Sequence, residues 1–184
     1  MSPTPLDILR YYRGCLEAFD ALQREVSPSL QAGALEHSSQ FFGMTSDEFD
    51  AALVELRNEL DYQVVMMLIA SFEAIFQSDL QDRVRRKKTD TISKALRRWW
   101  QENRHGADKW IHMESLLDAW KGVITGHRQA IGRLRSLVLF RHWLAHGRYW
   151  PDRSGVGNID PFAAWQIGKE VFAVLPGLPS LPAW

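Results

Sequence analysis

The segment 137–148 contains the residues of this chain whose types and spacing are best suited to catalysis or ligand binding. It places Arg141, His142 and His146 within an otherwise apolar stretch that is expected to end a helix. A guanidinium offers phosphate a planar fork of donors, and an imidazole can take up and release protons near neutral pH. On an ideal helix Arg141 and His146 lie ~140° apart, whereas His142 and His146 share a face. Such a pair lines a cleft more easily between two facing helices than within one.

Two simpler explanations apply to the same residues. The helix dipole favours cations near a C-terminus, without any further purpose. His142 and His146 also have the i, i+4 spacing of some metal ligands, but no Asp or Glu lies near them in sequence as a third ligand. The single cysteine, Cys15, excludes a cysteine-based zinc site and an intramolecular disulfide. We therefore expect no metal site, and the apolar setting of the pair favours a functional role.

The segment Arg141–Gly147 has the sequence Arg-His-Trp-Leu-Ala-His-Gly, which resembles the Arg-x4–6-His signature of the HEPN superfamily. Members often have a polar residue directly after the arginine and end the motif in Ala-His-Gly. The all-helical layout and the position of the motif on a late helix agree with the resemblance. Some members have a tyrosine two residues after the histidine, where this chain has Arg148, so regulation by tyrosine modification is not carried over.

The resemblance implies a metal-independent ribonuclease whose Arg-His pairs meet in a homodimer. His146 would take the proton from a ribose 2′-OH, and Arg141 would hold the scissile phosphate and neutralise the charge that grows on its oxygens. The products would be a 2′,3′-cyclic phosphate and a 5′-OH, and DNA would not be cut. The resemblance also implies a toxin–antitoxin or phage-defence role, with an antitoxin or nucleotidyltransferase-like protein as a partner.

Two more residues join the catalytic candidates. His142 is the polar residue that follows Arg141, in a position where many relatives carry Asn or Asp. Glu73 lies in the apolar half of a long predicted helix, and its carboxylate can orient Arg141 through a charge-assisted pair, as an acidic residue does in some relatives. Equally, Glu73 can be a solvated position between core residues.

Basic residues are candidates for contact with an RNA backbone. Arg85 and Arg86 belong to the basic run 83–88, and Arg148 follows the motif. Trp99 and Trp100 would add stacking on bases. The simpler interpretation is that a charge run at a helix end is solvated and that tryptophans at helical spacing belong to the core.

Apolar residues recur every three or four positions and predict an all-α bundle of five or six helices. The first helix is expected from Thr4-Pro5 to Ser27-Pro28, because proline favours a helix start and restricts the residue before it. Residues 28–44 are expected to be a loop. A capping box at Thr45–Glu48 opens a long spine helix to about Lys88, with Leu56 and Met67 on its packed face. Shorter helices are predicted at about 90–106, 108–120 (stopped by Gly122), 127–146 and 160–174.

Length and composition indicate one globular domain over residues 1–175 and an irregular proline-rich tail over 176–184. The 22 basic residues equal the 22 acidic ones, so RNA contact requires a local basic patch. The N-terminus lacks the pattern of a secretion signal, and the longest uncharged apolar run, 64–70, is too short to span a bilayer. We expect a cytoplasmic protein that does not act at a membrane.

No Walker, GxGxxG, HExxH or GxSxG motif is present, so we expect no cofactor. The leading hypothesis is a homodimeric HEPN-type endoribonuclease, a hydrolase of RNA. The main alternative is a non-catalytic HEPN module that binds RNA, a nucleotide or a nucleotidyltransferase-like partner. A third alternative is a helical scaffold or immunity protein without a nucleic-acid role.

Overall fold

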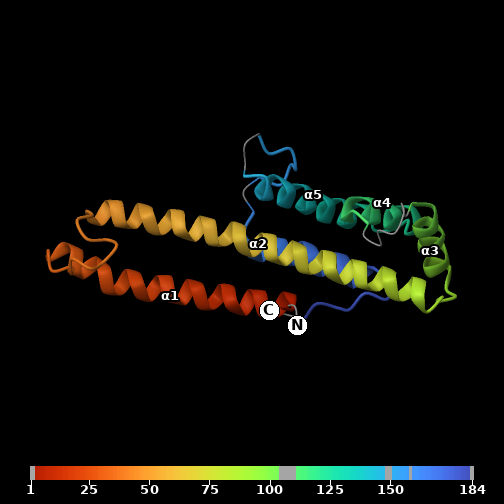
Figure 1. Ribbon diagram of the computed structural model, residues 1–184, viewed down its shortest axis with the longest axis horizontal. Coiled ribbons are helices and arrows are strands. Elements are labelled where there is room, and N and C mark those ends of the chain that lie inside the picture. The colour runs from red at the N-terminus through yellow and green to blue at the C-terminus, as the bar shows by residue number, and fades with distance from the viewer. Residues whose placement is uncertain (1–2, 104–110, 148–150, 158, 183–184) are drawn as a thin grey trace. The chain divides into compact units, whose positions relative to one another are not determined.

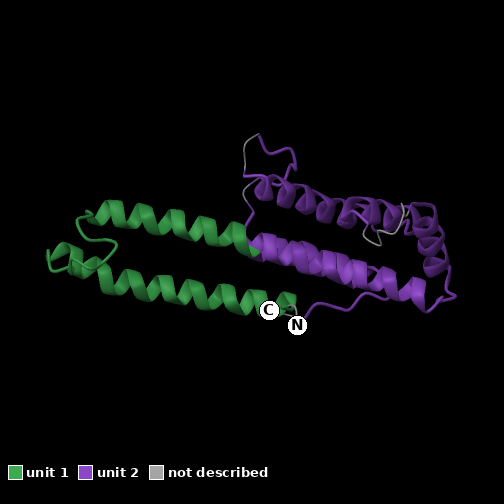
Figure 2. Ribbon diagram, viewed as in Figure 1, with its two compact units in different colours: residues 1–64 green, residues 65–184 purple. Residues whose placement is uncertain are grey.

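The computed structural model describes residues 3–103, 111–147, 151–157 and 159–182. Within these residues the chain forms α-helices and no strands, which confirms the predicted all-α fold (Figure 1). The helices are α1 (Pro5–Gln31), α2 (Ser46–Arg85), α3 (Thr91–Asn103), α4 (Met113–Val123), α5 (Arg128–Ala145) and α6 (Pro161–Val174). The chain divides into two compact units, residues 1–64 and 65–184, with the boundary inside α2 (Figure 2).

Unit 1 is a helical hairpin made of α1, the loop after it and the first part of α2. Its core cluster consists of the buried residues Val26, Phe41, Phe49 and Leu53. Side-chain bonds join the two helices: the Tyr12 hydroxyl donates to Asp61 at 2.7 Å, and Arg57 pairs with Asp20 at 2.7 Å. The predicted capping box starts α2, because the backbone N–H of Thr45 donates to Glu48 and that of Glu48 donates to the Thr45 hydroxyl.

The predicted end of the first helix at Pro28 is wrong. α1 continues to Gln31 with Pro28 inside it. A proline removes one N–H donor, but its carbonyl still accepts, and Ala32 N–H donates to Pro28 O at 3.0 Å. Leu30 packs on the unit 1 core beyond the proline, and this burial favours the extra turn.

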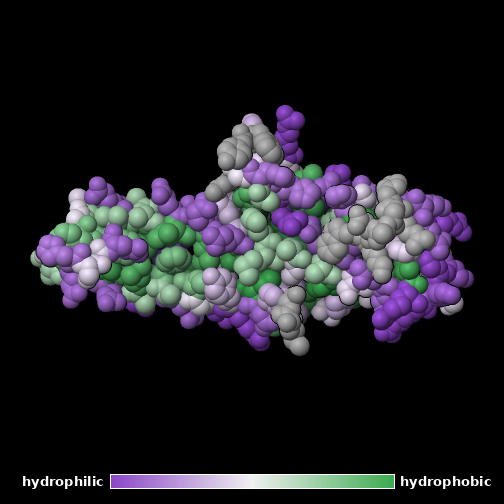
Figure 3. Space-filling model, viewed as in Figure 1, coloured by the Kyte–Doolittle hydropathy of each residue, from purple (hydrophilic) through white to green (hydrophobic). Residues whose placement is uncertain are grey.

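Two residues expected on the packed face of the spine helix are instead exposed. Leu56 and Met67 of α2 both have exposed side chains. Val54 of α2 and Tyr11 of α1 are exposed as well. Figure 3 shows hydrophobic residues (green) reaching the surface over unit 1. The 3.6-residue period identifies a helix, but a forty-residue helix has too many apolar positions for one narrow stripe to bury them all.

Unit 2 places the second part of α2 with α3 to α6. Helix α4 packs against α3 and α5, and α5 packs against α6. Phe72 and Phe76 of α2 meet Phe172 of α6 at ring distances of 5.5 and 5.4 Å, and Phe76 also meets the fully buried Trp120 of α4. These rings form the aromatic centre of the unit 2 core.

The boundaries of the shorter helices differ from the prediction mainly at α4. Ile111 and His112 are not helical, and α4 runs to Val123, so Gly122 lies in its last turn and does not stop it. Residues 104–110 lie outside the described residues. The other ends follow local signals: Asp90 accepts from Ser93 N–H at 2.9 Å, and Asp160 accepts from Ala163 N–H at 2.7 Å. Gly147, after α5, has a positive φ of 76°, which is typical of a glycine that follows the last turn of a helix.

α2 is also long and apolar enough to cross a membrane by length and composition alone. Core helices of soluble proteins meet the same criterion, and 44% of the apolar window is buried inside the structure. The cytoplasmic location therefore stays a prediction.

Candidate functional site

Arg141 and Glu73 form an ion pair between α5 and α2. Nη1 of Arg141 lies 3.1 Å from Oε1 and 3.0 Å from Oε2 of Glu73. The Glu73 side chain is 12% exposed and that of Arg141 is 30% exposed, so the carboxylate is the deeper partner. Of the two roles considered for Glu73, the structure has the contact with Arg141 and not a solvated position.

The Glu73 carboxyl lies in surroundings that disfavour its charged form. Burial raises its pKa, and the nearby Glu114 raises it further, while the positive charge of Arg141 acts in the opposite direction. The net effect is a raised pKa. Glu73 therefore takes up a proton more readily than an exposed glutamate, and protonation removes the negative partner of Arg141.

A second carboxylate holds His142. Nδ1 of His142 lies 3.1 Å from Oε1 of Glu114, in the first turn of α4. When Nδ1 carries the proton for this bond, the lone pair of a neutral imidazole is on Nε2, and that nitrogen can accept a proton. Glu114 was not among the residues singled out from the sequence, because nothing in local spacing relates the start of α4 to the end of α5.

These residues surround a small cavity. Its volume is about 110 Å³, and it is lined by Glu73, Gln77, His112, Met113, Arg141 and His142. The lining comes from three elements: one face of α2, the start of α4 and the end of α5. The structure thus brings three of the four catalytic candidates, Glu73, Arg141 and His142, to one place. Gln77 and His112 are additions that the sequence pattern did not indicate.

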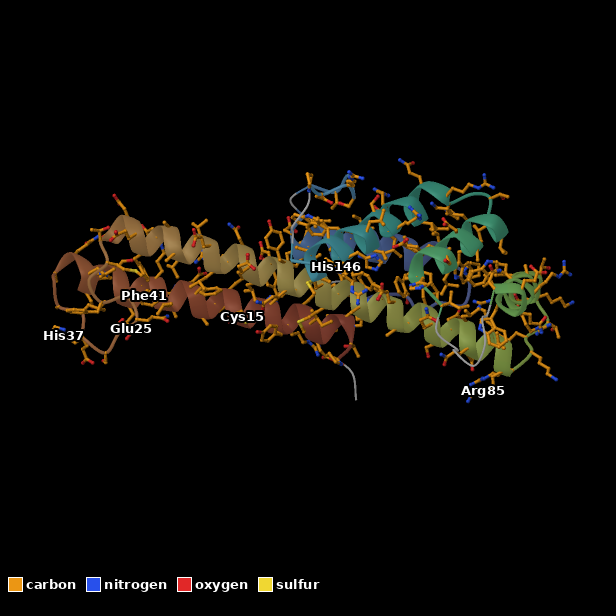
Figure 4. The ribbon with its side chains drawn as sticks, turned by 45° about the horizontal axis from the view of Figure 1, so that its top comes forward. Cys15, Glu25, His37, Phe41, Arg85 and His146 are labelled. Carbon is orange, nitrogen blue, oxygen red and sulfur yellow. The ribbon has the colours of Figure 1, made fainter. Side chains whose placement is uncertain are left out.

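The fourth candidate, His146, lies apart from this cavity lining. It is the C-cap residue of α5 and is exposed, one turn beyond His142 (Figure 4). Its backbone N–H donates to the carbonyl of His142 at 3.1 Å. The side chain is accessible from the surface, where a second molecule can approach it.

His142 also borders a second cavity, of about 190 Å³. This one is lined by Leu139, His142, Trp143, Asp152, Arg153 and Ser154. His142 therefore lines two cavities, of which the first is also lined by Arg141 and the second by Arg153. The ring of Trp143, which lines this second cavity, packs against Phe140 in a tilted arrangement with 5.4 Å between the ring centroids.

The basic run at the end of α2 divides into a buried and an exposed part. Arg83 is 3% exposed; it pairs with Asp79 at 2.6 Å, donates to Ser93 and to the Pro176 carbonyl, and lies over the Trp120 ring. A buried arginine with all these partners is structural. Arg83 is thus unavailable for the RNA contact considered for this run.

Arg85 and Arg86 are exposed and share one carboxylate. Arg85 lies 3.3 Å and Arg86 2.7 Å from Asp82. Arg85 also lines a cavity of about 500 Å³ together with Trp100 and Asp82. Figure 4 shows Arg85 well separated from His146, so these arginines belong to another surface. Arg148 lies outside the described residues.

Among the described residues, no group of three or more His, Cys, Asp or Glu side chains is arranged to hold a metal ion. The chain matches no protein-family model, no curated protein and no solved structure. The HEPN relationship therefore stays a proposal that rests on the motif.

Proposed function

We propose that this protein is a metal-independent endoribonuclease of the HEPN type. One observation carries the proposal: Arg141 and His142 line the same small cavity. Arg141 contacts the carboxylate of Glu73, and His142 contacts the carboxylate of Glu114. An arginine for the phosphate and an imidazole for proton transfer are the groups that cleavage of RNA without a metal requires.

His142 is the better candidate for the general base within one chain. In the proposed reaction, Nε2 of His142 takes the proton of the ribose 2′-OH, and the 2′-oxygen attacks the phosphorus. The bond from phosphorus to the 5′-oxygen breaks, and that oxygen leaves with a proton from a second acid. One RNA fragment then ends in a 2′,3′-cyclic phosphate, and the other begins with a 5′-OH.

Arg141 would contact the non-bridging oxygens of the scissile phosphate. Its contacts with Glu73 both use Nη1, and its side chain is part-exposed, so an incoming phosphate can approach the same guanidinium. Charge on those oxygens grows in the transition state, and a guanidinium fixed by a carboxylate is already oriented to stabilise it. Glu73 is a positioning residue in this account.

His146 fits a role at the interface of a homodimer. It is exposed at the end of α5, so its ring could reach the Arg141–His142 cavity of a second copy. His146 is therefore the candidate for the acid that protonates the 5′-oxygen. In this proposal His142 has the base role that the family resemblance assigns to His146. A toxin or phage-defence setting, with an antitoxin or nucleotidyltransferase-like partner, belongs to the same proposal.

The test uses a pair of matched oligonucleotides in excess EDTA. One is an end-labelled RNA, and the other carries 2′-deoxyribose throughout. We expect the purified chain to cut only the RNA and to leave cyclic-phosphate ends. Cleavage of both, or cleavage that needs an added divalent metal, contradicts the mechanism. Binding without cleavage over several RNA substrates favours the alternative of a non-catalytic RNA-binding module.

A further inference from the structure

Gln77, in the wall of the cavity beside Arg141, has an acceptor without a partner. The residue is 3% exposed, and its Nε2 donates to the backbone carbonyl of Ile111. The amide must meet that carbonyl with its nitrogen, since two oxygens would repel each other. Among the residues that the structure describes, Oε1 of Gln77 has no hydrogen-bond partner. A buried acceptor of this kind gains from a ligand that supplies a donor.

The neighbours of Gln77 show which ligand groups the cavity suits. Glu73 lies one turn earlier on the same face of α2, and its carboxylate adds acceptor oxygens to the same lining. A group that presents N–H or O–H donors fits these two acceptors, whereas a carbonyl oxygen placed against them is repelled. The volume of about 110 Å³ is small, so the cavity suits one functional group at the edge of a ring rather than a whole nucleotide.

We propose that this cavity binds the exocyclic amine of a nucleobase, with Oε1 of Gln77 as the acceptor. The inference rests on the proposed function, because it places the amine-bearing edge of a base next to the phosphate that Arg141 holds. Cytosine presents an N4 amine where uracil presents the O4 oxygen, and adenine presents an N6 amine. The site therefore favours cytidine and adenosine over uridine.

The test is calorimetric binding of two ligands of nearly equal size, cytidine 3′-monophosphate and uridine 3′-monophosphate, to the full chain. We expect the wild-type protein to bind the cytidine nucleotide about ten- to a hundredfold more tightly, because uridine leaves the buried acceptor unpaired. Gln77→Met has a similar side-chain size without the acceptor, and it should bind both nucleotides equally. Gln63→Met, at an exposed glutamine of the same helix, is the control and should keep the preference.

A second variant covers the case in which Gln77→Met fails to fold. In Gln77→Glu, the protonated carboxyl keeps a donor for the Ile111 carbonyl and an acceptor for the ligand, so the preference of this variant for cytidine should increase as the pH is lowered. Equal binding of both nucleotides by the wild type, no binding of either, or a preference that survives in Gln77→Met overturns the inference.

The outcome is separable from that of the cleavage assay. A Gln77-dependent preference without RNA cleavage keeps this inference and contradicts the proposed ribonuclease. Cleavage of RNA without any such preference supports the proposed ribonuclease and contradicts this inference.

Discussion

Arg141 and Glu73 illustrate at the residue scale how one contact can serve both structure and chemistry. The carboxylate lies deeper than the guanidinium, and the contact uses one nitrogen of the fork. Removing either partner alone leaves the other charge in a part-buried place, which is more costly than removing both. In the proposed function a bound phosphate competes with Glu73 for the same cation, so the charge on Glu73 would set how strongly Arg141 attracts RNA.

The charge on Glu73 leads to a prediction about pH. Because burial raises the pKa of Glu73, it becomes neutral at a higher pH than an exposed glutamate does, and in the proposed function Arg141 is then freed for phosphate. Glu73→Gln imitates the neutral form at every pH. We expect Glu73→Gln to bind a non-cleavable 2′-deoxy oligonucleotide more tightly than wild type at pH 8, with the two dissociation constants converging as the pH falls towards 4.

The comparison with wild type removes every effect of pH that the two proteins share. Fluorescence anisotropy at constant salt gives the dissociation constants. A ratio between the two proteins that stays constant with pH would show that Glu73 does not control the charge of Arg141.

The sequence identified Arg141, His142 and Glu73 as candidates, but it did not identify Glu114 or Gln77. The first three stand out because charged groups interrupt apolar stretches. Glu114 is one of many acidic residues near a helix start, and Gln77 is one of many glutamines. Their importance comes from the packing of α2, α4 and α5, which brings distant parts of the chain together and leaves no local spacing to recognise.

At the scale of elements, α6 approaches α2 closely through a glycine. A Cβ atom added at Gly168 would lie 2.4 Å from the ring of Phe72, which is fully buried. Phe172, one turn after Gly168 on α6, also packs against this ring at a centroid distance of 5.5 Å. The glycine therefore sets the distance between the two helices, and α2 carries Glu73 and Gln77 at the cavity.

Gly168→Ala should destabilise the protein by about 1–3 kcal/mol through overpacking. Gly132→Ala is the matched control, because Gly132 is also helical but has open space around the added atom. That control should gain about 0.5–1 kcal/mol from helix propensity. Urea unfolding followed by circular dichroism measures both, and equal effects at the two positions would contradict the close approach of α6 to α2.

The helix starts that have a capping side chain were predictable because caps depend on residues three apart, whereas the start of α4, whose N-cap His112 makes no side-chain cap bond, was not. Thr45–Glu48, Asp90 and Asp160 all cap as their types suggest. The end of α1 and the exposure of Leu56 and Met67 were not predictable in this way. Both depend on which apolar surface finds a partner in the tertiary structure, and burial of Leu30 outweighs the local effect of Pro28.

At the scale of the whole molecule, the zero net charge gives RNA no general attraction, so association depends on local groups. The exposed end of α5, with His146 and the neighbouring Trp143 surface, is where the proposal requires a second copy. Arg141→Ala and His146→Ala are each expected to lose activity. Mixed together, they should regain about a quarter of the wild-type rate, because half of the dimers are mixed and each has one intact shared site.

Light scattering at micromolar concentration accompanies this experiment. A monomeric mass, or mixtures that stay inactive after subunit exchange, would argue against a site shared between two protomers. It would leave the Arg141–His142 cavity as a site within one chain.

Two arginines of the same helix, Arg141 and Arg133, test whether the active site is at Arg141. Arg141 lies at the cavity, and Arg133 pairs with Glu170 on the surface of α5 and α6. In excess EDTA, single-turnover cleavage of a labelled RNA should fall by about 10²–10³ in Arg141→Ala/Glu73→Gln, which removes both charges of the pair together. Arg133→Ala should keep the wild-type rate. Equal rates for the wild type and the double variant, or an equal loss in both variants, would contradict an active site at Arg141.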